Sequence, residues 1–129
     1  MRASCLCGGI TIEIGGPIHS PRYCHCTNCR KFSGTAFAAW GVVDAAQFEV
    51  KRAVSEIVRF DSGGGHRAFC GTCGTPLFYE PEGHPQLRGI PLGIIDHGEV
   101  PAPSMHVWTR SKMPWASIED DLPRYDTHP

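Results

Sequence analysis

Long apolar segments are missing from this 129-residue chain. The longest apolar stretch, residues 36–43, is less than half of the roughly 20 residues that a bilayer-spanning helix needs, and Gly41 interrupts it. The first nine residues, MRASCLCGG, contain no apolar core of a secretory signal. We therefore expect a soluble protein of the cytoplasm that is neither secreted nor bound to a membrane.

The chain also lacks an excess of charge of either sign. Twelve Lys and Arg residues nearly balance 13 Asp and Glu residues, which leaves a formal net charge of -1. Binding to a nucleic-acid backbone requires a basic surface, and no basic extension is present, so we expect no nucleic-acid partner. The glycine run at residues 63–65 lacks the Lys-Ser/Thr that follows in a phosphate-binding loop, so we assign it no nucleotide site.

Long helical patterns are scarce, because 15 glycines and 11 prolines interrupt the chain frequently. Short strands joined by turns fit this composition better, and without βαβ patterns the sheets should be mainly antiparallel. The length suits a single domain, residues 1–129, with one modest core. Alternating or apolar patterns predict strands at residues 9–14, 35–43, 48–51, 55–61, 67–69, 76–80, 87–95 and 105–109.

The segments between these strands complete the outline. A loop is expected between the turn at residues 15–17 and the cysteines that begin at Cys24. A short helical turn is expected at residues 27–32, with Thr27 as its N-cap. The acidic, proline-containing tail after Trp115 is expected to lie over the surface.

Seven cysteines fall in three tight clusters, at residues 5–7, 24–29 and 70–73. An odd number of cysteines in a reducing compartment argues against a framework of disulfides. Sulfurs so close in sequence suit a shared metal ion better than a set of separate cross-links. The cysteine pattern therefore predicts metal sites.

One site is predicted to be closed by four thiolates. The pattern Cys70-x-x-Cys73, followed by a glycine, is typical of a zinc knuckle, which needs a second pair of ligands to complete a tetrahedron. Cys5-x-Cys7 offers that pair and would clamp the start of the chain to its middle. Buried free thiols are the alternative interpretation of these four residues.

The remaining cysteines, Cys24, Cys26 and Cys29, have no fourth cysteine to join them. Three protein ligands and an open position are typical of a catalytic zinc. Three thiolates would give the site a formal charge of about −1, which weakens it as a Lewis acid, so a soft thiol suits the open position better than hydroxide. Two alternatives stay open: a histidine such as His25 closes the site, or Cys24 and Cys26 join one of the other pairs.

Basic residues flank this trio and suggest how a substrate is held. Arg22, Arg30 and Lys31 are candidates to offset its charge or to pair with substrate carboxylates. His25 lies between two of the ligands, so its ring should point away from the metal. We expect His25, Arg30 and Lys31 to bind substrate.

Other conspicuous side chains have simpler interpretations. Arg67, three residues before Cys70, is expected to be a solvated strand residue. His106 lies in a strand pattern, where a core or surface histidine is the default and a pocket role the alternative. The three tryptophans are assigned to the core: Trp40, Trp108 and Trp115.

Four blocks of sequence together resemble one known family. They are CLCGG at residues 5–9, CHCTNCRKFSG at 24–34, RAFCGTCG at 67–74 and PSMHVW at 103–108. They are similar to the glutathione-dependent formaldehyde-activating enzymes, a family that also includes centromere protein V. The resemblance implies a mainly β protein, a β-tent fold of antiparallel sheets with few short helices and two zinc sites.

The resemblance also implies roles for the cysteines and an activity. The pair matching Cys5 and Cys7 joins the pair matching Cys70 and Cys73 at a structural zinc, and the remaining trio holds a zinc near the active site. The family's named reaction condenses glutathione with formaldehyde to S-hydroxymethylglutathione, which is classed as carbon–sulfur lyase chemistry.

We therefore expect a zinc-dependent, carbon–sulfur lyase-like enzyme with two Zn²⁺ per chain, which adds glutathione or a similar small thiol to an aldehyde such as formaldehyde. A non-catalytic zinc-binding interaction module is the first alternative. A methionine sulfoxide reductase is the second, and it would need a nucleophilic cysteine that binds no metal.

Overall fold

Eleven strands and one α-helix make up the structure, a computed structural model that describes residues 1–129. A four-stranded sheet has the order β10-β1-β2-β5, formed by Ile95–His97, Arg2–Ser4, Ile10–Ile14 and Phe48–Ala53. A seven-stranded sheet has the order β11-β3-β4-β9-β8-β7-β6, formed by His106–Val107, His19–Cys24, Ala38–Asp44, Leu87–Pro91, Pro76–Pro81, Gly65–Cys70 and Ile57–Asp61. The helix α1 (Thr27–Ser33) and three 3₁₀ turns, η1 (Ala45–Gln47), η2 (Leu92–Ile94) and η3 (Thr109–Ser111), complete the chain.

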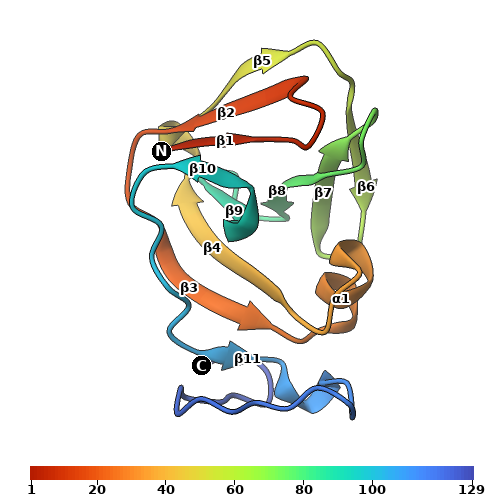
Figure 1. Ribbon diagram of the computed structural model, residues 1–129, viewed down its shortest axis with the longest axis vertical. Helices are drawn as coiled ribbons and strands as arrows, with labels where there is room; N and C mark the ends of the chain where they lie inside the picture. Colours follow the sequence, from red (N-terminus) through yellow and green to blue (C-terminus); the bar gives the residue numbers. More distant parts are fainter.

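The strand pairing confirms a mainly β fold of largely antiparallel sheets. Every pair of strands is antiparallel except β3 and β11, which run parallel. The four-stranded sheet lies toward one end of the long axis, and the C-terminal segment after β11 lies at the other end (Figure 1). The longest helix has seven residues, so no helix reaches the length of a membrane span.

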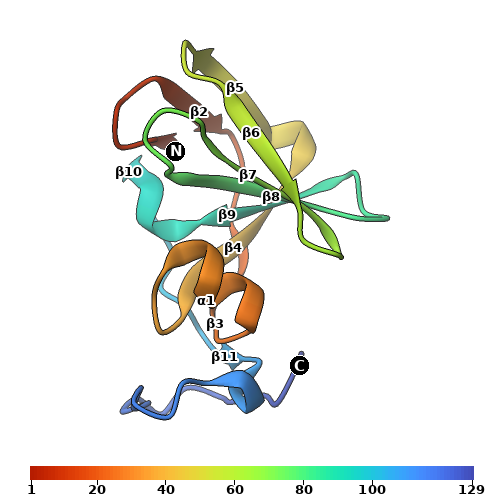
Figure 2. The same cartoon turned by 90° about the vertical axis from the view of Figure 1, so that its right-hand side faces the viewer.

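The main core joins the two sheets. Ile10, Ile12 and Ile14 alternate along β2 and are almost completely buried, as the period of two in a strand requires. They belong to one cluster of 13 buried residues with Leu77 and Phe78 of β8. A second, smaller cluster lies beside the helix and contains Cys24, Cys29 and Trp40 among others. The helix α1 lies beside the lower ends of β3 and β4 in both views (Figures 1 and 2).

Strands occur where the alternating patterns predicted them, with boundaries shifted by a few residues. The segment predicted at residues 87–95 is divided into β9, η2 and β10, and the short strand β1 was not predicted. The hairpin of β7 and β8 carries the third cysteine cluster at its turn, as expected.

The loop expected before Cys24 is a strand, so that expectation is wrong. The sequence HSPRYC of β3 does not alternate, and Pro21 lacks an N–H to donate. The strand forms because it pairs with β4, with an irregularity in register between His19 and Arg22. Ser20 adopts the left-handed region within that irregularity, at φ 47°.

Trp115 does not belong to the core, which corrects the assignment made from sequence. Its side chain is 68% exposed. It lies in a turn closed by the bond from Ala116 N to Met113 O at 3.1 Å, outside every paired strand. No sheet face is therefore available to cover it.

Gly65 is a position where only glycine fits, at the start of the β7–β8 hairpin that carries the third cysteine cluster. Substituting it tests the structure of that hairpin. Its φ is 150°, and an added Cβ would lie 2.3 Å from the backbone oxygen of Glu80. We expect Gly65→Ala to lower the free energy of unfolding in urea by about 2 kcal/mol or more.

Gly93→Ala is the matched control for this substitution. An added Cβ there meets nothing within 4 Å. The control should change stability by less than about 1 kcal/mol. Equal effects of the two substitutions would contradict the structure at Gly65.

Candidate metal centres

The fold brings all seven cysteines into two separate groups. One group combines the Cys-x-Cys pair near the N-terminus with the Cys-x-x-Cys pair at the turn between β7 and β8, and the other group is the remaining trio. In each group the sulfur atoms lie within 4.8 Å of one another. The members are Cys5, Cys7, Cys70 and Cys73 in the first group, and Cys24, Cys26 and Cys29 in the second. This grouping matches the partition expected from ligand counting, and no cysteine lies outside it.

The four-cysteine group has the spacing that tetrahedral zinc requires. A metal with sulfur ligands at about 2.3 Å places neighbouring sulfurs about 3.8 Å apart. The Sγ atoms of Cys5 and Cys7 are 3.6 Å apart, and those of Cys7 and Cys70 are 3.8 Å apart. The backbone N–H of Ile10 donates to Cys5 Sγ at 3.3 Å, a contact that favours a thiolate acceptor. The donor set therefore fits a structural zinc.

The backbone around the trio explains why three sulfurs converge there. Cys24 ends β3, where it pairs with Ala38 of β4. Cys26 is the N-cap of α1, and its sulfur accepts the N–H of Cys29 at 3.3 Å. Thr27, the N-cap expected from sequence, is instead the first helical residue. The N-cap bond holds Cys26 and Cys29 together, because it spans the spacing of a Cys-x-x-Cys motif.

Proton affinities in the trio indicate that the sulfurs compete for one negative charge. Hydrogen bonds from the thiols of Cys24 and Cys29 lower the pKa of Cys26 to about 2. The bonds to Cys26 and Cys29 in turn raise the pKa of Cys24. A divalent cation removes this competition, because it stabilises every thiolate at once. The chemistry of this donor set therefore fits a metal as well.

Arg67 is buried against the trio, which corrects its interpretation as a solvated residue. Its side chain is 7% exposed, and its Nη1 donates to Cys29 Sγ at 3.8 Å. The guanidinium lies over the rings of Phe32 and Tyr79, at 5.6 Å and 4.9 Å from the ring centroids. No carboxylate pairs with it. The sulfur of Cys29 is therefore its acceptor within the trio, and the positive charge of Arg67 would stabilise that sulfur as a thiolate.

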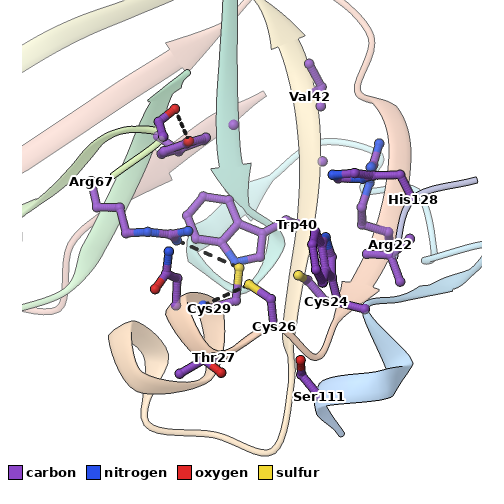
Figure 3. A pocket seen from close by; sticks show the side chains of 17 residues that line it. Arg22, Cys24, Cys26, Thr27, Cys29, Trp40, Val42, Arg67, Ser111 and His128 are labelled. Carbon is purple, nitrogen blue, oxygen red and sulfur yellow. Dashed lines mark hydrogen bonds between the residues drawn. The ribbon is translucent and has the colours of Figure 1, made fainter. Parts of the chain in front are cut away.

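A cavity of about 600 Å³ opens on the trio but not on the four-cysteine group. Its wall includes all three cysteines and the aromatic rings of Trp40, Tyr79 and Trp108. Figure 3 shows the three sulfurs between Arg67 on one side and Arg22 and His128 on the other. No Asp or Glu lines the cavity. The arrangement therefore favours an anionic ligand that reaches the sulfurs.

Trp40 forms the part of the wall closest to the trio. Its side chain is 7% exposed, and its Nε1 has no hydrogen-bond partner in the protein. The indole belongs to the same buried cluster as Cys24 and Cys29, so its ring packs beside the trio.

The three residues expected to bind substrate lie outside the cavity wall. His25 is completely buried, and its ring packs against Phe37 at a centroid distance of 5.0 Å. Arg30 is occupied by Met113 Sδ, the carbonyl of His25 and the hydroxyl of Thr27. Lys31 is exposed on the helix. Their substrate-binding role stays a prediction.

Sequence analysis missed Arg67 and Tyr79 as residues of this cavity. They are neighbours only through the pairing of β7 with β8, where Arg67 lies opposite Tyr79. The period of two in β7 gave a partial signal, because it places Arg67 on the face opposite Ala68 and Cys70, away from the four-cysteine group. That pattern does not predict that β8 pairs with β7 and places Tyr79 opposite Arg67.

The fold and the two groups of sulfurs define a mainly β protein with two cysteine clusters that could each hold a metal ion. The family model of the glutathione-dependent formaldehyde-activating enzymes matches residues 1–111, and the chain belongs to that family. The crystal structure of a protein from Rhodobacter sphaeroides is similar, with a TM-score of 0.60 and 22% identity, over 77% of this chain and 91% of that one. No curated protein shows significant similarity to the chain.

The hydroxyl of Thr75 supports the four-cysteine group, and its removal makes a test. It accepts the N–H of Leu6 at 3.0 Å and lies 3.2 Å from Cys73 Sγ, where it lowers the pKa of that thiol to about 5. We expect Thr75→Val to lower the free energy of unfolding in urea by about 1 kcal/mol, because both contacts are lost.

Thr72→Val serves as the control in the same turn, since Thr72 is exposed and its hydroxyl makes no hydrogen bond. Its effect should stay within about 0.5 kcal/mol. A Thr75→Val protein as stable as the Thr72→Val protein would show that the hydroxyl does not support the group.

Proposed function

We propose that residues 1–129 form a single zinc-binding domain that adds a small thiol, glutathione or a similar molecule, to an aldehyde such as formaldehyde. One observation carries the proposal: the three-cysteine group lines a cavity of about 600 Å³, and no member of the four-cysteine group belongs to the wall of that cavity. A closed set of four ligands is typical of structural zinc, and an open set of three is typical of catalytic zinc. Membership of the formaldehyde-activating family supports this class of reaction.

Each chain would hold two zinc ions, one in each group of cysteines. Zinc bound to Cys24, Cys26 and Cys29 would keep a substrate thiol in its thiolate form at neutral pH. No histidine nitrogen or carboxylate oxygen joins these three sulfurs, which supports an open position for that thiol. Cysteines that serve as metal ligands need a reducing compartment, so a cytoplasmic location is part of the proposal.

The proposed addition balances without an oxidant or a reductant. A bond forms between the thiol sulfur and the carbonyl carbon, the π-electron pair moves to the carbonyl oxygen, and the thiol proton ends on that oxygen. Arg67 lines the cavity beside Cys29 and carries a positive charge that would stabilise the developing oxyanion. The rings of Trp40 and Tyr79 cover the same part of the cavity and would exclude water.

The cavity also supports an anionic thiol as the substrate. Arg22 lines it, and the only hydrogen bond of its guanidinium within the protein runs from Nε to the carbonyl of Ser20 at 2.9 Å. Its other N–H groups are available to a carboxylate, which an arginine binds well. Of the three basic residues that the sequence suggested as partners of a substrate carboxylate, Arg22, Arg30 and Lys31, only Arg22 belongs to the cavity wall.

Activity is tested by following formaldehyde consumption with glutathione, cysteine and 2-mercaptoethanol, using zinc-loaded protein. We expect a rate above the spontaneous reaction with at least one thiol. Cys26→Ser should reduce it to the spontaneous rate, because the variant loses a ligand of the open site. Elemental analysis should give two zinc equivalents in the wild type and one in the variant, with an unchanged circular dichroism spectrum.

A rate equal to the spontaneous reaction for every thiol would remove the enzymatic proposal. If both metals then proved to be bound by four protein ligands, the non-catalytic interaction module would replace it. A thiol that reacts rapidly in the zinc-loaded protein would instead favour the sulfoxide reductase, since every cysteine should be protected by metal.

The role of Arg22 is tested by comparing thiols with and without a carboxylate. We expect Arg22→Met to raise KM for glutathione about tenfold or more, because a charged hydrogen bond is lost, and to leave KM for 2-mercaptoethanol unchanged. Arg52→Met is the control, because Arg52 is exposed on β5 and lies outside the cavity. Equal changes for both thiols would exclude Arg22 as the carboxylate partner.

A further inference from the structure

A chain of hydrogen bonds runs from the C-terminal segment to His25, the residue between Cys24 and Cys26. Asp120 Oδ2 lies 2.9 Å from His106 Nε2, and His106 Nδ1 lies 2.9 Å from His25 Nε2. The two histidines are 2% and 0% exposed. The proposed reaction uses none of these three residues.

Chemistry fixes the direction of this chain. An ionised Asp120 only accepts hydrogen bonds, and its bond with His106 lowers the pKa of the carboxyl group. His25 Nδ1 is buried without a hydrogen-bond partner, so an N–H there would be unsatisfied, and the proton of His25 belongs on Nε2, which donates to His106 Nδ1. His106 Nε2 then donates to Asp120. Asp120 thus fixes the tautomer and the orientation of both rings, as a carboxylate does behind a metal-binding histidine.

His25 transmits this constraint to the metal centre, because it joins Cys24 to Cys26. Its N–H donates to the carbonyl of Val107 at 3.0 Å, and its carbonyl accepts from Arg30 Nε at 3.2 Å. Side chains alternate in direction along an extended backbone, so a ring fixed on one side holds the two flanking sulfurs on the other.

Asp120, at the far end of this series of hydrogen bonds, lies outside the part of the protein that matches the family, which ends at residue 111. Residues 123–127 are nevertheless bonded along β11 and Trp108: Tyr125 N donates to His106 O at 2.9 Å, and Trp108 N donates to Thr127 O at 2.9 Å. His128 packs against Trp108 with ring centroids 5.5 Å apart, and both line the cavity. The segment of residues 112–129 therefore reaches the site in two places.

We infer that Asp120 is a positioning residue that acts through His106 and His25 on the extended segment Cys24–Cys26, which makes the C-terminal segment a component of the three-cysteine metal site. The inference rests on the metal assignment within the proposed function. It does not depend on the reaction itself, and its readout is metal retention rather than activity.

The test follows the release of zinc from full-length, zinc-loaded protein to a chromogenic chelator by stopped flow. The wild type should release two equivalents, and Cys26→Ser protein, which keeps only the four-cysteine site, assigns the phases. We expect Asp120→Ala to accelerate release from the three-cysteine site about tenfold and to leave the other phase unchanged. Asp120→Asn should restore the wild-type rate, because its amide oxygen still accepts from His106.

Asp121→Ala is the matched control, since Asp121 is the exposed neighbouring carboxylate and makes no hydrogen bond with its side chain. Wild-type release from Asp120→Ala protein would overturn the inference, and so would equal acceleration of both phases, which indicates general loosening of the fold. A wild type that binds one zinc would instead refute the metal assignment of the proposed function.

A measurement on the wild type tests the same inference without any substitution. Nuclear magnetic resonance of the imidazole nitrogens should find the proton on Nε2 in both His25 and His106. A proton on Nδ1 of His25, with Nε2 as the acceptor, would reverse the bond between the rings and contradict the proposed direction of the chain.

Discussion

The close approach of seven sulfur atoms in two groups is the constraint on which the rest of the structure depends. Within each group the sulfurs lie within 4.8 Å, so thiolates there repel one another unless a cation lies among them. The four-cysteine group joins residues 63 positions apart, Cys7 and Cys70, in a chain whose main core has 13 buried residues. A metal at that position would contribute much of the folding free energy of such a small protein. The trio joins residues close in sequence and constrains the chain far less.

The same electrostatic argument explains why an arginine is buried without a carboxylate. Removing the charge of Arg67 from water is costly unless an anion compensates for it, and a metal-bound thiolate at Cys29 would be the anion within reach. Three thiolates with one divalent cation keep a negative charge, which Arg67 offsets without adding a further ligand. The absence of acidic residues from the cavity wall leaves its positive charge available to a ligand. The cavity thus combines a metal-binding end with cationic sides.

The sequence predicted those features that depend on residues close together in the chain. Cysteine spacing gave both groups, and alternation gave most strands, because each signal lies within a few residues. The strand β3 was missed, since its residues HSPRYC carry no alternation and only the partner β4 makes them extended. Arg67 was misinterpreted for a related reason: its burial depends on Tyr79 and Phe32, which belong to other elements. The conformation and burial of such residues depend on which strands pair, and the sequence alone does not specify that pairing.

The C-terminal segment both covers the edge of a sheet and contributes a residue to the cavity wall. Because β11 ends the seven-stranded sheet, its outer edge would be exposed, and residues 123–127 cover it through backbone bonds. The same residues bring His128 against Trp108 at the cavity wall. A segment that is held by its backbone can change its side chains at little cost to the fold. Changes at His128 would therefore reshape the cavity wall without altering any cysteine.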